Sequence, residues 1–341
     1  MADNQAFGGN DRYYASESPN GPGVAFGACA RELSEVLLQH DPDLPSKVER
    51  AFTQWNGILR DYLRNETGLR LSVGEDKRAV PVRISGGLPL PLNQVLEELS
   101  DPTVWYLYLQ RRTISSATVG LDLVSTGYGV VESWFENGLP ASQDDVDRTL
   151  QLFKKLEGWL NALELLKKIG AIEQDILGAY FFRIPEVRLY WMVIGLIAGA
   201  LQVSVEALTF VVAAHELAHA YTHLGRDIDG RRWDVDVFSR TDSKIVEGLA
   251  QFYTRMICEK IKDRFPAAVD AYTRLVAIQT GPYRAHLDWG GTEDSTGEVV
   301  RFAMIEARSR NIEHYGEYQK ELEEIRKRTA RSRKAAVVSG K

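Results

Sequence analysis

The chain has 341 residues, of which 44% are hydrophobic and 26% are charged, and its formal net charge is −6. This length and hydrophobic content suit a globular protein with a sizeable core and exclude a mainly disordered chain. The acidic balance argues against a general nucleic-acid binder. The longest apolar run, residues 189–201, falls short of the roughly 18 to 20 residues that span a bilayer, so we expect a buried core segment and no membrane contact.

The first 23 residues are rich in Asn, Gly, Ser and Asp and lack the apolar core of a signal peptide. We expect a disordered lead-in over residues 1–23. The two cysteines, Cys29 and Cys258, form neither a disulfide framework nor a Cys-based zinc site. A cytoplasmic location is therefore the default expectation.

Residues 24–170 are predicted to form a mainly helical N-terminal region. Apolar residues recur with helical spacing over residues 24–39, 48–64 and 144–169, and Gly170 is expected to end the last helix. Two β-like runs, 70–73 and 80–84, flank a charged turn, and a short helix follows near residues 92–99. Nothing in this region carries metal chemistry, so we expect it to restrict access to a site elsewhere or to recruit substrate.

The pattern changes after residue 177, where two short runs are rich in aromatic and β-branched residues. These runs, 177–183 and 185–191, predict two strands of a small sheet. Residues 187–191 are a candidate for an edge strand that aligns an extended substrate by backbone pairing, and an ordinary core strand is the alternative.

A buried helix is predicted over residues 205–224, with Ser204 as its N-cap. It carries His215-Glu216-Leu217-Ala218-His219 within an uncharged stretch. Residues four apart share one helix face about 6 Å apart along the axis, so both imidazoles can reach one ion at roughly 2.0 to 2.1 Å. Glu216 is rotated by about 100° and can take a proton from a water whose pKa zinc has lowered. A chance match is the alternative.

At these residues the chain resembles the zincin metallopeptidases, whose extended signature asks for uncharged residues around the motif. The resemblance implies a third ligand on a following helix, and Glu247 resembles the third ligand of the Glu-type zincins, of which thermolysin is a member. An ordinary glutamate at a helix start is the alternative. Gln251 stands where many of these enzymes carry an Asp that is hydrogen-bonded to a ligand histidine.

His223 continues the four-residue spacing, but it lies about 12 Å along the helix axis from His215, too far for one ion to bind both. We therefore interpret His223 as a histidine that supports the site from behind or lies at the surface. The chain also has some similarity to cytoplasmic zincins that cleave repressors in mobile elements and stress responses. That similarity rests on His223 and on Ala250, three residues after Glu247.

Downstream, helices are predicted over residues 267–278 and 297–308. Glu-type zincins typically use a Tyr or His in this region to stabilise the oxyanion, and Tyr283 and His286 are the nearest candidates, with His314 and Tyr315 behind them. A structural role is the alternative for each. A charged helix is predicted over residues 317–334, and a basic flexible tail over residues 326–341 is the only segment where nucleic-acid contact is plausible.

The sequence thus predicts an α+β, mostly helical fold, in which residues 171–325 form a zincin-like domain with a short sheet, an active-site helix and a third-ligand helix. We expect one Zn²⁺ per chain, held by His215, His219 and Glu247, with Glu216 as general base and a protein or peptide as substrate. The alternative is a non-catalytic, zinc-stabilised binding or regulatory module. Glu216 argues against it, because a structural site needs no base and is usually closed by a fourth protein ligand.

Overall fold

The computed structural model describes residues 24–25, 27–71, 80–99, 102–135, 138–172, 175–290 and 296–339. The predicted lead-in, 1–23, and the predicted charged turn, 74–78, lie outside these ranges. The described chain is mostly helical and contains two small sheets, so the predicted α+β, mostly helical class is confirmed. No helix within the described ranges is both long enough and apolar enough to cross a membrane.

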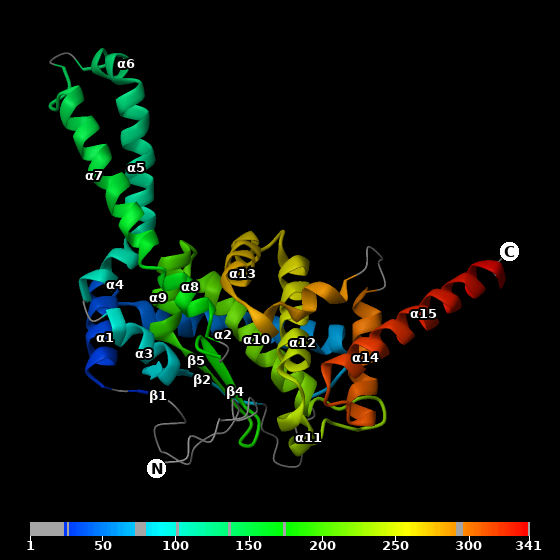
Figure 1. Cartoon of the computed structure of the whole chain (residues 1–341). Helices are drawn as coiled ribbons and strands as arrows, with labels where there is room; N and C mark the ends of the chain where they lie inside the picture. The colour runs from blue at the N-terminus through cyan, green and yellow to red at the C-terminus, as the bar shows by residue number, and fades with distance from the viewer. Residues whose placement is uncertain are drawn as a thin grey trace, which may run out of the picture.

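Helices dominate both halves of the chain (Figure 1). The first half contains α1 (Ala28–His40), α2 (Leu44–Thr67), α3 (Leu90–Leu99), α4 (Pro102–Leu109), α5 (Arg111–Thr126), α6 (Tyr128–Glu132), α7 (Gln143–Ala162) and α8 (Leu165–Gly170). The second half contains α9 (Trp191–Leu201), α10 (Val205–Leu224), α11 (Val235–Arg240), α12 (Ser243–Ile261), α13 (Pro266–Ile278), the 3-10 helix η2 (Gly281–Trp289), α14 (Thr296–Arg310) and α15 (Tyr315–Ser339).

The larger sheet has three strands in the order β2-β5-β4. These are β2 (Val82–Ser85), β4 (Gly178–Phe181) and β5 (Glu186–Tyr190), and β5 pairs in parallel with β2 and antiparallel with β4. The interpretation of residues 187–191 as an edge strand is therefore wrong, because β5 is the central strand and β4 is an edge. Four of the five side chains of β5 are buried, which is typical of a strand covered on both faces. A second, two-stranded sheet joins β1 (Val24–Ala25) to β3 (Leu88–Pro89).

The core crosses the predicted boundary at residue 170. Helix α2 lies directly on α10, where the Trp55 ring meets the Phe210 ring edge-on at 5.3 Å and the Tyr221 hydroxyl donates to the Arg60 carbonyl at 3.0 Å. Strand β2 also comes from the first half of the chain, and buried residues of both halves belong to one hydrophobic cluster. The division into a helical region and a zincin-like domain stays a prediction. A boundary at residue 170 would cut through this sheet and this core.

The helix predicted over residues 144–169 is two helices. The capping box of Ser142 and Asp145 begins α7, which ends at Ala162, and Glu164 then adopts a left-handed φ of 51° before α8. This break lets Leu165 and Ile169 enter the core, while α5 and α7 stand side by side outside the body with α6 at their tip (Figure 1). Tertiary packing therefore ends the long helix before Gly170.

The last helix, α15, is longer than predicted and extends away from the body (Figure 1). It continues to Ser339, so residues 326–339 are helical where a flexible tail was predicted. Arg326 donates to the Trp289 carbonyl at 2.9 Å, which fixes this part of the helix against η2. Abundant Arg, Lys and Ala residues, which favour helix, account for the continuation.

Candidate metal centre

Helix α10 presents the motif from a fully packed scaffold. Ser204 Oγ accepts a hydrogen bond from the Ala207 N–H at 3.2 Å, so the helix begins at the predicted N-cap. Every residue from Ala207 to His223 is buried, because α2, α9, α12, α13 and the sheet surround the helix. The two motif histidines are therefore held in place by the core.

Helix α12 brings Glu247 to the same place. Asp242 caps this helix by accepting from the Lys244 N–H at 2.8 Å, and Glu247 lies in the second turn. The next residue, Gly248, packs so closely on Trp289 of η2 that an added Cβ would lie 2.5 Å from two ring carbons. The absence of a side chain at Gly248 allows α12 to pack against η2 behind the site.

The three predicted metal ligands converge on one point. His215 Nε2 lies 3.1 Å from His219 Nε2 and 3.2 Å from Glu247 Oε2, and His219 Nε2 lies 3.3 Å from the same oxygen. In a tetrahedral shell with ligands at about 2.0 to 2.1 Å from the metal, neighbouring ligand atoms are about 3.3 to 3.4 Å apart. The nearly equilateral triangle fits one ion at bonding distance from all three atoms.

The ionisable groups of this triangle shift one another's pKa values. Burial by itself would raise the pKa of Glu247, but the neighbouring His219 and hydrogen bonds from both histidines outweigh it and lower the pKa. Burial would likewise lower the pKa of His219, but Glu247 raises it. The triangle therefore favours an ionised Glu247, the form that binds a cation.

Asp175 is a fourth member of this cluster, and the sequence analysis missed it. Its Oδ1 lies 3.8 Å from His215 Nε2, and its side chain is only 12% exposed. Ligand atoms of Asp175, His215, His219 and Glu247 all lie within 4.8 Å of one another, so this buried group could hold a metal ion. The only signal in the sequence is a lone carboxylate just before a predicted strand, and no motif singles it out.

Glu216 lies between this cluster and strand β4. Burial first, and then the charges of Asp175 and Glu247, raise its pKa well above the ordinary range. Its carboxylate accepts a hydrogen bond from the Tyr180 backbone, and its Oε2 has no hydrogen-bond partner among the described residues. A Cβ added to Gly178 would lie 2.8 Å from Glu216 Cγ, so a glycine is needed where β4 passes this side chain.

Of the two residues predicted to stabilise an oxyanion, the structure brings only Tyr283 to the site. Its hydroxyl donates to Asp175 Oδ1 at 2.6 Å, and its ring centroid is 6.0 Å from that of His215. His286 lies behind it, bonded to the Tyr272 hydroxyl at 2.8 Å and to the Tyr283 carbonyl at 3.1 Å. Burial lowers the pKa of His286 to about 4.

The two residues behind His286 do not reach the site. His314 is exposed, and the Tyr315 hydroxyl accepts from Trp289 Nε1 at 3.1 Å. Neither residue lines the pocket beside the metal cluster. Tyr283 is thus the one candidate donor that faces the pocket among those predicted.

His223 is fully buried and lies apart from the four-residue cluster, so the surface interpretation is wrong. Its Nδ1 lies 2.9 Å from the Tyr180 hydroxyl, and its ring stacks on Phe238 at 4.4 Å between centroids. The Gln251 amide donates to Gln279 Oε1 at 3.0 Å. His215 Nδ1 has no hydrogen-bond partner among the residues described.

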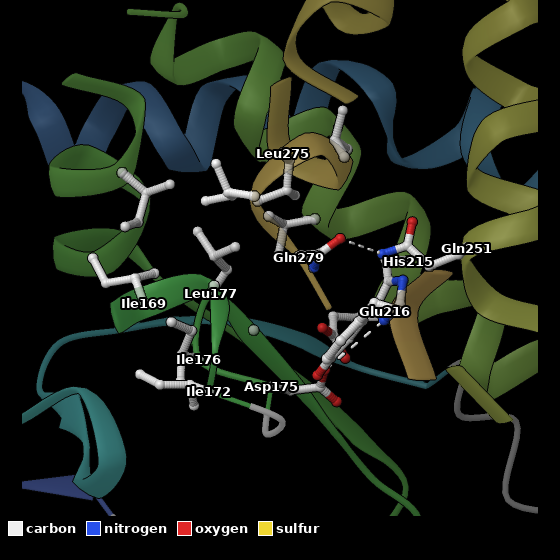
Figure 2. A pocket seen from close by; sticks show the side chains of 17 residues that line it. Ile169, Ile172, Asp175, Ile176, Leu177, His215, Glu216, Gln251, Leu275 and Gln279 are labelled. Atoms are coloured by element: carbon white, nitrogen blue, oxygen red, sulfur yellow. Dashed lines mark hydrogen bonds and ion pairs between the residues drawn. The ribbon is translucent and has the colours of Figure 1, made fainter. Parts of the chain in front are cut away.

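A pocket opens directly beside the cluster (Figure 2). Asp175, His215 and Glu216 lie together at one end, with Gln251 and Gln279 nearby, and Ile169, Ile172 and Ile176 lie at the other end (Figure 2). Other apolar side chains complete the lining: Leu177, Ile197, Val211, Val212, Leu275 and Ile278. The pocket therefore combines a polar end that contains the cluster with an apolar end.

Comparisons with protein-family models, with curated proteins and with solved structures found no match. The resemblance to the zincins therefore rests on the motif residues of the sequence alone.

Proposed function

We propose that the protein is a zinc-dependent metallopeptidase, with the metal held by His215, His219 and Glu247. The observation that carries the proposal is the convergence of two imidazole nitrogens and one carboxylate oxygen at separations of 3.1 to 3.3 Å. This donor set suits zinc. When bound, zinc would polarise the amide carbonyl and lower the pKa of water.

Glu216 is the general base in this proposal. It faces the pocket beside His215 and is held against β4, where the Tyr180 backbone donates to it. A carboxylate in this position can accept a proton from the attacking water and return it to the leaving amine. The surroundings that raise the pKa of Glu216 also help it to hold that proton between the two steps.

Tyr283 and strand β4 supply the remaining parts. The Tyr283 hydroxyl is the donor available to an oxyanion, once it no longer donates to Asp175. Strand β4 is an edge strand whose residue Gly178 lines the pocket, so an extended substrate can pair with it. The apolar end of the pocket then receives an apolar side chain of the peptide.

One observation favours the non-catalytic alternative. Asp175 places a fourth ligand-type side chain next to the triangle, and a closed four-ligand site is typical of structural zinc. The buried base Glu216 favours catalysis, because a structural site has no use for it. Turnover that depends on Glu216 separates the two functions.

The test is a proteome-wide comparison of newly formed peptide N-termini after treatment with the native protein, Glu216→Gln or Glu206→Gln. Glu206 is the matched control, because it is an exposed glutamate on the same helix. The native protein and the control are expected to produce the same cleavages, and Glu216→Gln is expected to be slower by at least roughly 10² to 10⁴ with zinc retained. Equal cleavage by all three would reject Glu216 as the base.

A further inference from the structure

We propose that Asp175 is a fourth protein ligand of this metal and closes the centre when no substrate is bound, so that hydrolysis requires its carboxylate to leave. The inference rests on the proposed function, because it assigns a regulatory step to the same site. It accounts for a carboxylate that the base, the three-ligand set and the oxyanion donor leave without a role.

Asp175 lies close to the other three ligand-type side chains. Its Oδ1 is 3.8 Å from His215 Nε2, and its ligand atom lies within 4.8 Å of those of His219 and Glu247. It also lines the pocket, as do His215 and Glu216. A small rotation of the side chain would complete a four-ligand shell and occupy the position that a reacting water needs.

The buried charges around the metal position also favour Asp175 as a ligand. Three carboxylates, those of Asp175, Glu216 and Glu247, meet in one buried place, and the described residues that line the pocket include no Lys or Arg. Buried charges are paired or bind metals, because an isolated one is strongly destabilising. Within the ligand shell, two neutral imidazoles and Glu247 alone would leave a divalent ion with one excess positive charge. Asp175 neutralises it.

The contact with Tyr283 links closure to catalysis. The Tyr283 hydroxyl donates to Asp175 Oδ1 at 2.6 Å, so the same hydrogen bond holds the carboxylate and occupies the donor proposed for the oxyanion. Asp175 lies on the connection between α8 and β4, whereas the other three ligands lie on the long helices α10 and α12. A substrate that displaces Asp175 would therefore open the metal position and free the Tyr283 hydroxyl together, without disturbing either helix.

The experiment measures metal and ligand binding instead of turnover. Zn²⁺ affinity is determined by competition with a chromophoric chelator, and acetohydroxamate, a small metal-chelating anion, is titrated into the Co²⁺-loaded protein by visible absorption. The variants are Asp175→Ala and the nearly isosteric Asp175→Asn, and the control is Asp270→Asn, an exposed aspartate on α13. We expect both Asp175 variants to lose at least about tenfold in Zn²⁺ affinity and to gain at least about tenfold in acetohydroxamate affinity, with the control unchanged.

Asp175→Asn is the control for misfolding, because it keeps the volume of the side chain. Native Zn²⁺ and acetohydroxamate affinities in both folded variants would overturn the inference. If the variants gain acetohydroxamate affinity but neither they nor the native protein cleave any peptide, Asp175 is a ligand and the peptidase proposal fails. If the native protein cleaves peptides and binds acetohydroxamate as tightly as Asp175→Ala, the peptidase stands and the closure is rejected.

Discussion

At the scale of single residues, the buried histidines fall into two groups. His215 and His219 face Glu247, whereas His223 and His286 each lie within hydrogen-bond distance of a tyrosine hydroxyl, Tyr180 and Tyr272 respectively. Burial lowers the pKa of His223 to about 3 and that of His286 to about 4. Both are therefore neutral in the folded protein at neutral pH, and protonating either one disfavours the fold.

The lowered pKa values of His223 and His286 predict that the folded protein loses stability in acid. A histidine whose folded pKa lies below its unfolded value, about 6.5, stabilises the fold fully above pH 6.5 and loses that contribution as pH falls. The free energy of unfolding is expected to fall from pH 6.5 towards pH 4, with about 1.4 kcal/mol per pH unit from each such histidine. Denaturant unfolding of the chelator-treated protein at several pH values measures it.

Two variants separate this effect from the titration of carboxylates. His223→Gln removes one proton-binding group. The slope of the free energy of unfolding against pH, between pH 6.5 and 5, should therefore decrease by the equivalent of about one bound proton relative to the native protein. His314→Gln, at an exposed histidine, is the matched control for the substitution itself. Equal slopes in the native protein and His223→Gln would show that His223 is not held neutral by burial.

Residues of the candidate site could be predicted from the sequence alone only where they belong to one local motif. His215, Glu216 and His219 lie on one helix, so their geometry follows from the helical repeat. Glu247 was predicted from a resemblance on a second helix. Asp175 lies on the connection between α8 and β4, and Tyr283 lies in η2. The two residues meet only through the fold, and no local pattern encodes such a meeting.

At the scale of elements, β4 approaches α10 closely beside Glu216, the proposed base. A Cβ at residue 178 would lie 2.8 Å from Glu216 Cγ and 3.0 Å from the Arg188 carbonyl oxygen. We expect Gly178→Ala to displace the Glu216 carboxylate and to slow peptide hydrolysis at least tenfold, while zinc content stays at the native level. Gly57→Ala is the matched control, because that exposed glycine of α2 has open space where a Cβ would be added.

The measurement for this prediction is a cleavage rate with zinc determined on the same sample. In Gly57→Ala the rate should be native and the free energy of unfolding should rise by roughly 0.5 to 1 kcal/mol, as expected for Gly→Ala inside a helix. A native rate in Gly178→Ala would mean that Glu216 does not depend on β4 for its position.

Element boundaries were predictable where capping residues mark them. Ser204 and Pro266 define the starts of α10 and α13, as the sequence indicates. The break between α7 and α8 was missed because the helical pattern continues through it, and only the burial of Leu165 and Ile169 explains the turn. The central position of β5 depends on β2, which lies about a hundred residues earlier in the chain and outside any local window.

At the scale of the whole molecule, the two halves share a core around α10. Helix α2 from the first half packs on α10 from the second, and strand β2 from the first half pairs with β5 from the second.

The α5–α7 hairpin stands apart from this body (Figure 1). Its apolar side chains include Leu123, Leu152 and Trp159, all of which are exposed.

Limited proteolysis tests whether the halves are separate. We expect a first cut beside the exposed Trp134 and Phe135, just after α6, with both pieces remaining together on size exclusion and zinc bound. Association is expected because separating the pieces would expose the apolar contacts between α2 and α10. A zinc-containing fragment that elutes alone would instead support a domain boundary near residue 170.

The most direct test of the proposed metal centre is the zinc content of the folded native protein, Glu247→Ala and His223→Ala, measured by mass spectrometry under non-denaturing conditions. We predict one zinc per chain in the native protein and in His223→Ala, because His223 bonds to Tyr180 and lies outside the metal cluster. Glu247→Ala should lose most of its zinc, because it removes one of the three converging ligand atoms. Zinc retained by Glu247→Ala and lost from His223→Ala would contradict the ligand set and the function built on it.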